Sequence, residues 1–356
     1  MADLYDLVTL AGVQRRIKVA PRFWLQEFFK RQINFETEWI MFDRVFTDMR
    51  KLAPFVVPNV AGRPQRLDGF STDRFKPAYS KQKDVVDYTM HMDRMAGEAL
   101  GGDMTFDQRR DAVIAYLLMM QKEKLQNTFN WLSAKAIIDG KVTIKGEDYP
   151  ETLVDFRRHA NLTTLLTGGA RWTETTADPL QDIKDSRIEA NGQSGARISK
   201  VVFGGVAWDL FAQRVDLKDL LDKNFGGVNT SGITRIAQLT EGYPDSIEYM
   251  GRISGANGEG AIDAWVDTTR YLDPVSGVET YYLEQDCVVG VSEMVEGVRC
   301  FGAIKDKRAG FRAMESFFKN WDEEDPSQEY LLTQSAPLMV PREPNATYKI
   351  KVTANA

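Results

Sequence analysis

The chain has 356 residues, 43% of them hydrophobic, so it can bury a large core, and its length predicts two domains or one elaborated domain. The composition argues against a membrane-spanning protein, because no apolar run approaches the roughly 18 residues of a span. It also argues against a disulfide framework, because only Cys287 and Cys300 are present. We expect both to be free thiols in adjacent buried strands. Asp3 and Asp6 stand where a signal peptide would be basic, so we expect the protein to stay in a reducing cytoplasm.

The net charge of −6 is unevenly distributed along the chain. Residues 1–83 hold 15 Lys and Arg against 9 Asp and Glu, a balance of +6, which leaves −12 for the remainder. A basic front segment and an acidic body can attract each other across copies of the same chain. A solvated basic tail explains the charge equally well.

Residues 1–48 are predicted to form an N-terminal arm, with a short helix that ends in a basic group and then an aromatic stretch. Phe28 and Phe29 belong to this stretch. Aromatic clusters can also stack nucleic-acid bases, but acidic residues are interleaved here, which favours packing against protein. Because no separate helical domain precedes the arm, we expect the chain to be used without removal of a long prosequence.

Residues 49–88 are predicted to form an extended loop. Its prolines exclude a helix and a central strand, yet the segment is too apolar for a solvated linker. An isolated two-stranded ribbon is marginal in water, so we expect an extended hairpin that packs on another subunit. The predicted apolar contacts are Phe55, Phe70, Phe75 and Tyr79, and the predicted charged contacts are Arg63, Arg66 and Arg74.

A single long helix is predicted from Thr105 to Asp139, about 50 Å long at 1.5 Å per residue. Thr105 and Gln108 form a capping box, and Gly140 provides the stop. One apolar stripe follows the helix, made of Ile114, Leu118, Leu125, Phe129, Leu132 and Ala136. Residues 112–120 are apolar nearly all round and residues 121–127 are mostly polar. We therefore expect the first half to be enclosed and the second to cross a surface.

The rest of the chain mixes strands and helices, which predicts an α+β fold. Helices are expected at 180–190, 206–215 and 217–221. Strands are expected at 85–92, 142–144, 152–156, 200–203, 246–250, 261–268, 287–291, 298–304 and 330–332, with a hairpin that joins 268–271 to 280–283. A Pro-rich tail follows.

Motifs for catalysis are missing from the sequence. Neither His91 nor His159 has a metal-binding spacing, and no Ser lies in a Gly-x-Ser-x-Gly elbow. A Gly-Gly pair at 204–205 lacks the Lys-Ser/Thr of a phosphate-binding loop. The acidic run 322–325 suits a solvated turn better than a Ca²⁺ loop. We predict no catalytic residue, no cofactor and no metal ion. A hydrolase whose carboxylates meet only in space is a distant alternative.

Three stretches of the chain carry distinctive motifs. The loop region carries Pro58, Val60, Gly62, Arg66, Gly69, Ser71, Thr72, Phe75, Pro77, Tyr79, Lys81 and Lys83. The middle carries Gly168-Gly169, Trp172, Asp178-Pro179 and Asp182-Ile183. The C-terminal part carries Lys319-Asn320-Trp321, Asp325-Pro326, Glu329, Tyr330 and the run 334–339, QSAPLM. These stretches resemble the major capsid protein E family of lambda-like tailed phages. The gap from Trp321 to Asp325 is one residue shorter than the family's, and residues 205–300 show no motif.

The resemblance implies a Hong Kong 97-like phage capsid fold, and the chain divides accordingly. The expected parts are the N-terminal arm (1–48), the extended loop (49–88), a peripheral domain (89–177 and 300–342) with a spine helix (105–139), an axial domain (178–299) and a C-terminal tail (343–356). Trp321, in the most specific motif, joins the predicted subunit-interface residues.

The implied function is a major capsid protein that self-assembles as pentamers and hexamers into the icosahedral head of a tailed bacteriophage, assembled in the host cytoplasm. The implied partners are other copies of the chain, a scaffolding protein, a portal, a decoration protein, and nonspecifically bound double-stranded DNA. No membrane partner is expected. A compartment shell of the same fold, encapsulin-like and filled with protein cargo, is the nearest alternative.

Overall fold

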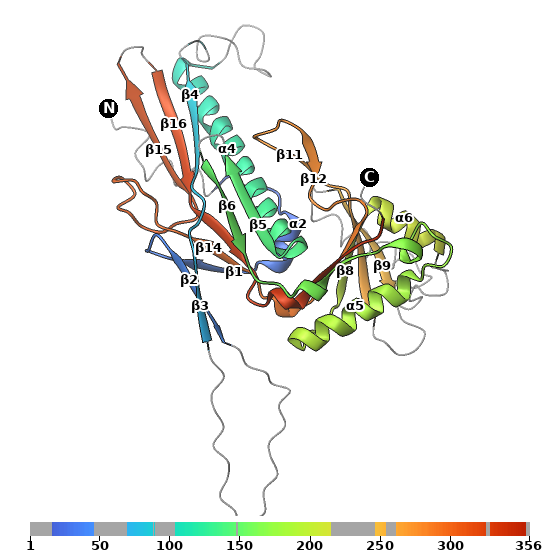
Figure 1. Ribbon diagram of the computed structural model, residues 1–356. Coiled ribbons are helices and arrows are strands. Elements are labelled where there is room, and N and C mark those ends of the chain that lie inside the picture. Colours follow the sequence, from blue (N-terminus) through green and yellow to red (C-terminus); the bar gives the residue numbers. More distant parts are fainter. Residues whose placement is uncertain are drawn as a thin grey trace, which may run out of the picture.

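The computed structural model describes residues 16–45, 70–87, 89, 104–146, 149–214, 246–253, 261–324 and 328–353. Its largest helix, α4 (Phe106–Ile138), runs beside a three-stranded sheet at one end of the molecule (Figure 1). A six-stranded sheet with two helices, α5 (Pro179–Ser194) and α6 (Gly205–Arg214), lies at the other end. The fold is therefore α+β, as predicted. None of the helices in these ranges is long and apolar enough to cross a membrane.

Helix α4 begins as the sequence predicts. The Gln108 amide donates to the Thr105 hydroxyl (3.3 Å), and the Thr105 amide donates to the Gln108 side chain (2.9 Å). Both bonds satisfy amides that the helix start leaves without partners. All six residues of the predicted apolar stripe are buried.

The prediction for the two halves of α4 is wrong. In the first half Tyr116 and Met119 are 55% and 40% exposed, whereas residues 129–138 are mostly buried. The first half packs with one face only, against β4 (Ser80–Val86) and the two strands that pair beside it. The second half is enclosed by the short helix α2 (Phe23–Phe28) and by three strands, β5 (Lys141–Gly146), β17 (Pro337–Val340) and β18 (Thr347–Lys351). A helix segment that is apolar on all sides still stays partly exposed where no other element of the chain covers it.

The six-stranded sheet has the order β7-β18-β13-β8-β10-β9. Its strands are β7 (Thr163–Leu165), β18 (Thr347–Lys351), β13 (Cys287–Val291), β8 (Lys200–Gly204), β10 (Ile262–Asp267) and β9 (Ile247–Ile253). The predicted tail 343–356 is thus corrected, because β18 lies between β13 and β7 inside the sheet. Tyr348 and Ile350 are 1% exposed and supply the apolar face that holds it there. We call this six-stranded sheet the axial sheet, because most of its strands come from the predicted axial segment 178–299, while β7 comes from the predicted peripheral segment.

Two three-stranded sheets accompany α4. The first has the order β15-β16-β4, with β15 (Phe317–Glu323), β16 (Gln328–Ser335) and β4 (Ser80–Val86). The second has the order β1-β14-β17, with β1 (Arg31–Asn34), β14 (Val298–Phe301) and β17 (Pro337–Val340). The predicted strand 85–92 is displaced, since β4 ends at Val86. The acidic run 322–325 is only partly a turn, since β15 extends through Glu323.

The remaining elements are hairpins and short 3-10 helices. The hairpins join β2 (Ile40–Val45) to β3 (Phe70–Phe75), β5 (Lys141–Gly146) to β6 (Tyr149–Asp155), and β11 (Arg270–Leu272) to β12 (Glu279–Tyr281). The 3-10 helices are η1 (Ala160–Leu162), η2 (Gly168–Ala170), η3 (Glu293–Val295) and η4 (Pro344–Ala346). The predicted helix 217–221 lies outside the described residues.

Cys287 and Cys300 are buried free thiols, as predicted. They lie in β13 and β14, which follow each other along the chain but belong to different sheets. Burial raises the pKa of the Cys300 thiol to about 12, so this group is uncharged at neutral pH.

Candidate interface surfaces

The described parts of the chain on either side of residues 46–69 pair with each other as strands β2 and β3. The two strands are antiparallel, with Ile40 opposite Phe75 and Val45 opposite Phe70. Phe70 is thus placed by its backbone at the far end of the hairpin. Phe55, Arg63 and Arg66 lie outside the described residues, so their predicted contacts stay predictions.

Phe75 and Tyr79 attach the base of this hairpin to the body of the same chain. The ring of Phe75 lies 5.8 Å from that of Phe156. The Tyr79 hydroxyl donates to the Gln334 side chain (2.6 Å) and accepts from the Lys305 amide (3.1 Å). Both side chains are half-buried, whereas Arg74 is exposed. Arg74 has the most free surface of these three predicted contacts.

Phe28 and Phe29 require a correction. They are 6% and 0% exposed within a single chain, because α2 packs into the main hydrophobic core beside α4. Trp24 on the same helix donates through its indole nitrogen to the buried Asp267 carboxylate (2.8 Å). The sequence predicted that this aromatic run belongs to an arm. In the structure the run packs inside its own chain and forms part of the core. Phe28 and Phe29 have little surface left for a neighbouring subunit.

A polar cluster beside the hairpin was missed by the sequence reasoning. Glu38 pairs with Lys76 (3.1 Å) and Lys305 (2.8 Å), and the Lys76 ammonium lies 5.9 Å from the centre of the Trp39 ring. Hydrogen bonds from Lys305 and Lys76 lower the pKa of Glu38. The charged members of this cluster, Glu38, Lys76 and Lys305, are far apart in the sequence and share no regular spacing, so only the fold brings them together.

Trp321 lies on the face of the β15-β16-β4 sheet that is turned away from α4. It stands opposite Tyr330, which stands opposite Val85, and the Trp321 and Tyr330 rings stack at 5.3 Å. The Lys83 ammonium lies 3.5 Å from the centre of the Tyr330 ring, and the Lys319 ammonium lies 5.4 Å from that of Trp321. Cation–π contacts of this kind hold aromatic rings at the surface. We call Lys83, Val85, Lys319, Trp321 and Tyr330 the aromatic-lysine face.

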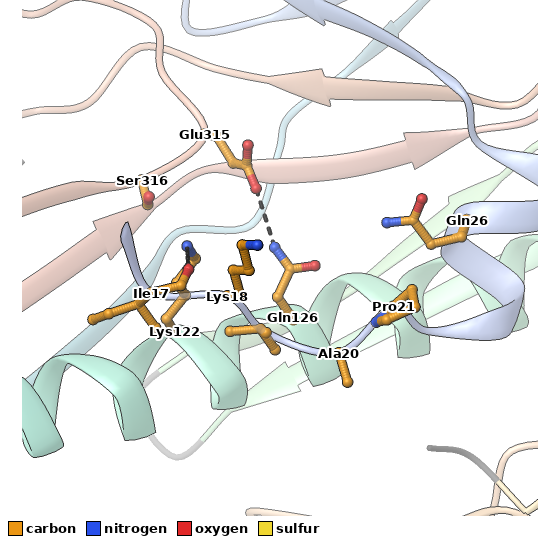
Figure 2. A pocket seen from close by; sticks show the side chains of 10 residues that line it. Ile17, Lys18, Ala20, Pro21, Gln26, Lys122, Gln126, Glu315 and Ser316 are labelled. Atoms are coloured by element: carbon orange, nitrogen blue, oxygen red, sulfur yellow. Dashed lines mark hydrogen bonds between the residues drawn. The ribbon is translucent and has the colours of Figure 1, made fainter. Parts of the chain in front are cut away.

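A groove of about 580 Å³ runs between the N-terminal segment and α4 (Figure 2). The Lys122 ammonium donates to the Ile17 carbonyl (2.6 Å), and the Gln126 amide donates to the Glu315 carboxylate (3.1 Å). Arg22 pairs with Glu123 at 3.4 Å. Residues 17–22 are therefore fastened along the helix of their own chain.

Three possible metal ligands, Glu284, Asp286 and Cys287, gather within 4.8 Å. The Lys349 and Lys351 ammonium groups lie 3.3 Å and 3.1 Å from Glu284, and Lys351 also lies 3.6 Å from Asp286, so both carboxylates already have cationic partners. Burial raises the pKa of the Cys287 thiol, so it does not supply a thiolate. This donor set suits an ion-pair network better than a metal ion.

Comparison with known proteins agrees with this arrangement. The profile of the family described as phage major capsid protein E matches residues 6–352. The major capsid proteins of Enterobacteria phage P21 and Escherichia phage lambda are each 27% identical, over 348 and 350 residues. Both matches cover 96% of this chain and 97% of the relative. A crystal structure reported for a prophage capsid protein of Escherichia coli CFT073 superposes with a TM-score of 0.72. It is 24% identical, and the match covers 98% of this chain and 99% of that one.

These matches confirm the predicted resemblance and the Hong Kong 97-like capsid fold. The family consists of structural capsid proteins, so the chain is a component of a virion and not an enzyme. The match spans both ends of the described chain, including the stretch 205–300 in which no motif was found. The chain belongs to the phage major capsid protein E family.

Proposed function

We propose that this chain assembles as pentamers and hexamers into the icosahedral head of a tailed double-stranded DNA phage, and that the head encloses the genome. The observation that carries the proposal is the family match along residues 6–352, on a chain that has the capsid fold. The chain also leaves Tyr116 and Met119 exposed on α4 and Val85 exposed on the aromatic-lysine face.

The physical basis of such assembly is the sum of many modest interfaces. Heterologous contacts between identical subunits close into rings, and the rings join through segments that reach onto neighbours. Each contact is weak alone, but a subunit held by several at once dissociates slowly. Arg74, the residues of the extended loop and Trp321 are the contacts proposed for these junctions. Phe75 and Tyr79 are proposed to hold the loop at its base.

Negative-stain microscopy of pelleted material from cells that express this chain tests the proposal, with mass photometry of the supernatant beside it. Shells, or rings of five and six subunits, are the expected result. Monomers alone, even after coexpression with the neighbouring head genes, would contradict it. Copurified DNA and tail proteins support a phage head, whereas a copurified enzyme would indicate a compartment shell.

The remaining partners are proposed on the same basis. We expect assembly in the host cytoplasm with a scaffolding protein, a portal and a decoration protein. Contact with packaged DNA is expected to be nonspecific and weak, because residues 84–356 carry a net charge of −12. The affinity of assembled subunits for DNA should fall steeply as the salt concentration rises from about 50 to about 200 mM, because binding to phosphates releases counterions.

A further inference from the structure

The C-terminal end of α4 meets the axial sheet at one strand, β18. The Lys349 ammonium pairs with Asp139, the residue that caps α4, at 2.8 Å, and with Glu284, which precedes β13, at 3.3 Å. Lys135, one turn back on α4, lies 3.6 Å from Asp139. A single side chain from the sheet therefore connects the end of the helix to the neighbouring strand.

A second cation completes this junction. The Arg158 guanidinium donates to the Ile137 carbonyl in the last turn of α4 (2.9 Å) and to the hydroxyls of Thr163 (2.8 Å) and Thr347 (3.4 Å). Burial lowers the pKa of Arg158 to about 10, so it still carries its charge at neutral pH. Cations at a helix C-terminus are favoured by the helix dipole. Arg158 thus connects the end of α4 to β7 and β18 through hydrogen bonds from one charged group.

The junction is sheltered from solvent. Lys349 is 8% exposed. Burial alone would lower the pKa of Lys349, but Asp139 and Glu284 raise it above the ordinary value. A lysine that stays charged in such a site must keep its partners, because an unpaired buried charge is costly. The positions of Asp139 and Lys349 are therefore coupled.

The same two parts of the molecule are also joined on α2. The Leu25 amide donates to the Asn130 side chain of α4 (3.1 Å), and Trp24 donates to Asp267 in the axial sheet (2.8 Å). Removal of the Lys349 contact therefore leaves the two parts attached through α2 and Arg158, while it loosens the angle between them.

We propose that Lys349 is a positioning residue that fixes the angle between α4 and the axial sheet, and thereby the curvature that each subunit imposes on the shell. This proposal rests on the proposed function, since curvature has meaning only in a shell. Atomic shifts of less than about 1 Å at one packed contact are amplified into changes of subunit shape, because packed interfaces switch between discrete arrangements.

The test compares Lys349→Met with Lys351→Met as the matched control. Lys351 lies on the same strand and pairs with Glu284 (3.1 Å) and Asp286 (3.6 Å), which belong to the axial part. We expect Lys349→Met shells to have a shifted and broader diameter distribution in electron microscopy, and Lys351→Met and Lys349→Arg shells to match the wild type. Folded Lys349→Met subunits that give wild-type diameters would overturn the proposal.

A second measurement separates this proposal from the proposed function. Spin labels at Lys124→Cys on α4 and Asp209→Cys on α6 are both at exposed positions, and the native cysteines are buried. The distance distribution in the monomer should broaden in Lys349→Met and stay narrow in Lys351→Met, whether or not shells form. Asp139→Ala breaks the same contact from the α4 side and replaces Lys349→Met if that variant does not fold. Unchanged distance distributions in the variants at Lys349 and Asp139 would refute the role of Lys349 in fixing this angle. A wild type that never forms shells would refute only the proposed function.

Discussion

The two sheets at opposite ends of α4 differ in what covers them. All five residues of β13 in the axial sheet are buried. The β15-β16-β4 sheet is covered by α4 on one side only, and its other side carries the aromatic-lysine face. Neighbouring α4 shows the same contrast, with an enclosed second half and an exposed first half. The axial sheet therefore stabilises the single chain, and the exposed surfaces around the first half of α4 are the ones that we propose for contacts with other copies.

The largest expected effect tests the packing of the axial sheet. A Cβ at Gly290 in β13 would lie 2.1 Å from the ring of Tyr348 in β18, which is 1% exposed. Because neither strand can move away, Gly290→Ala should lower the free energy of unfolding by about 3 kcal/mol. Urea denaturation of the monomer measures it.

Gly192→Ala in α5 is the matched control for this change. No atom lies within 4 Å of the Cβ position there, and Gly192 is helical. This variant should gain roughly 0.5–1 kcal/mol, because alanine favours a helix over glycine. An equally stable Gly290→Ala protein would show that the axial sheet is not tightly packed.

The next effect concerns α2, which joins the two regions. Trp24→Phe keeps the ring packing and removes the indole donor to Asp267, which is 1% exposed. We expect a loss of about 2 kcal/mol of unfolding free energy, because a buried carboxylate loses a hydrogen bond. The Trp24→Phe and Asp267→Asn double variant should then lose less than the sum of the two single variants. Strict additivity would indicate that the two groups do not act together.

A smaller effect is expected in the pH dependence of the unfolding free energy, through Glu284 beside the axial sheet. Burial opposes ionisation of Glu284, but Lys349 and Lys351 lower its pKa to about 2 from 4.5. The group binds fewer protons in the folded than in the unfolded chain, so its contribution is complete above pH 4.5 and is lost as the pH falls toward 2. The side chain is 48% exposed, so solvent screening limits the contribution to less than about 1 kcal/mol. Denaturation curves of Glu284→Gln should show a flatter pH dependence across this window.

Local signals in the sequence predicted local structure well. The capping box of α4, its apolar stripe and the strand 287–291 follow from residues close together in the chain, and all are confirmed. The family resemblance rested on short motifs and is confirmed along nearly the whole chain.

Long-range placement could not be predicted in this way. Nothing near residue 347 shows that β18 lies between β13 and β7, because strand pairing depends on segments more than 50 residues away. The aromatic residues around Phe28 signal burial, but not whether the partner is the same chain or another. The Lys349 and Arg158 junction likewise joins residues that no spacing relates.

The smallest effect on stability should accompany a large effect on assembly. Tyr116 and Met119 lie on the exposed face of α4, at 55% and 40% exposure. The double variant Tyr116→Ser and Met119→Ser should change the unfolding free energy of the monomer by less than about 0.5 kcal/mol, because surface substitutions remove few contacts. If this face is covered by another copy, the yield of shells should fall severalfold, and mass photometry should show more free subunits.

Ile188→Ser on α5 is the control for loss of exposed apolar surface, since Ile188 is 60% exposed beside the axial sheet. An equal loss of shells in this variant would mean that assembly responds to apolar surface anywhere on the chain. A loss confined to the α4 variant would assign the covered surface to the peripheral region. Unchanged assembly in both would place the contacts in other segments, so the contrast between the two ends of α4 would then concern folding alone.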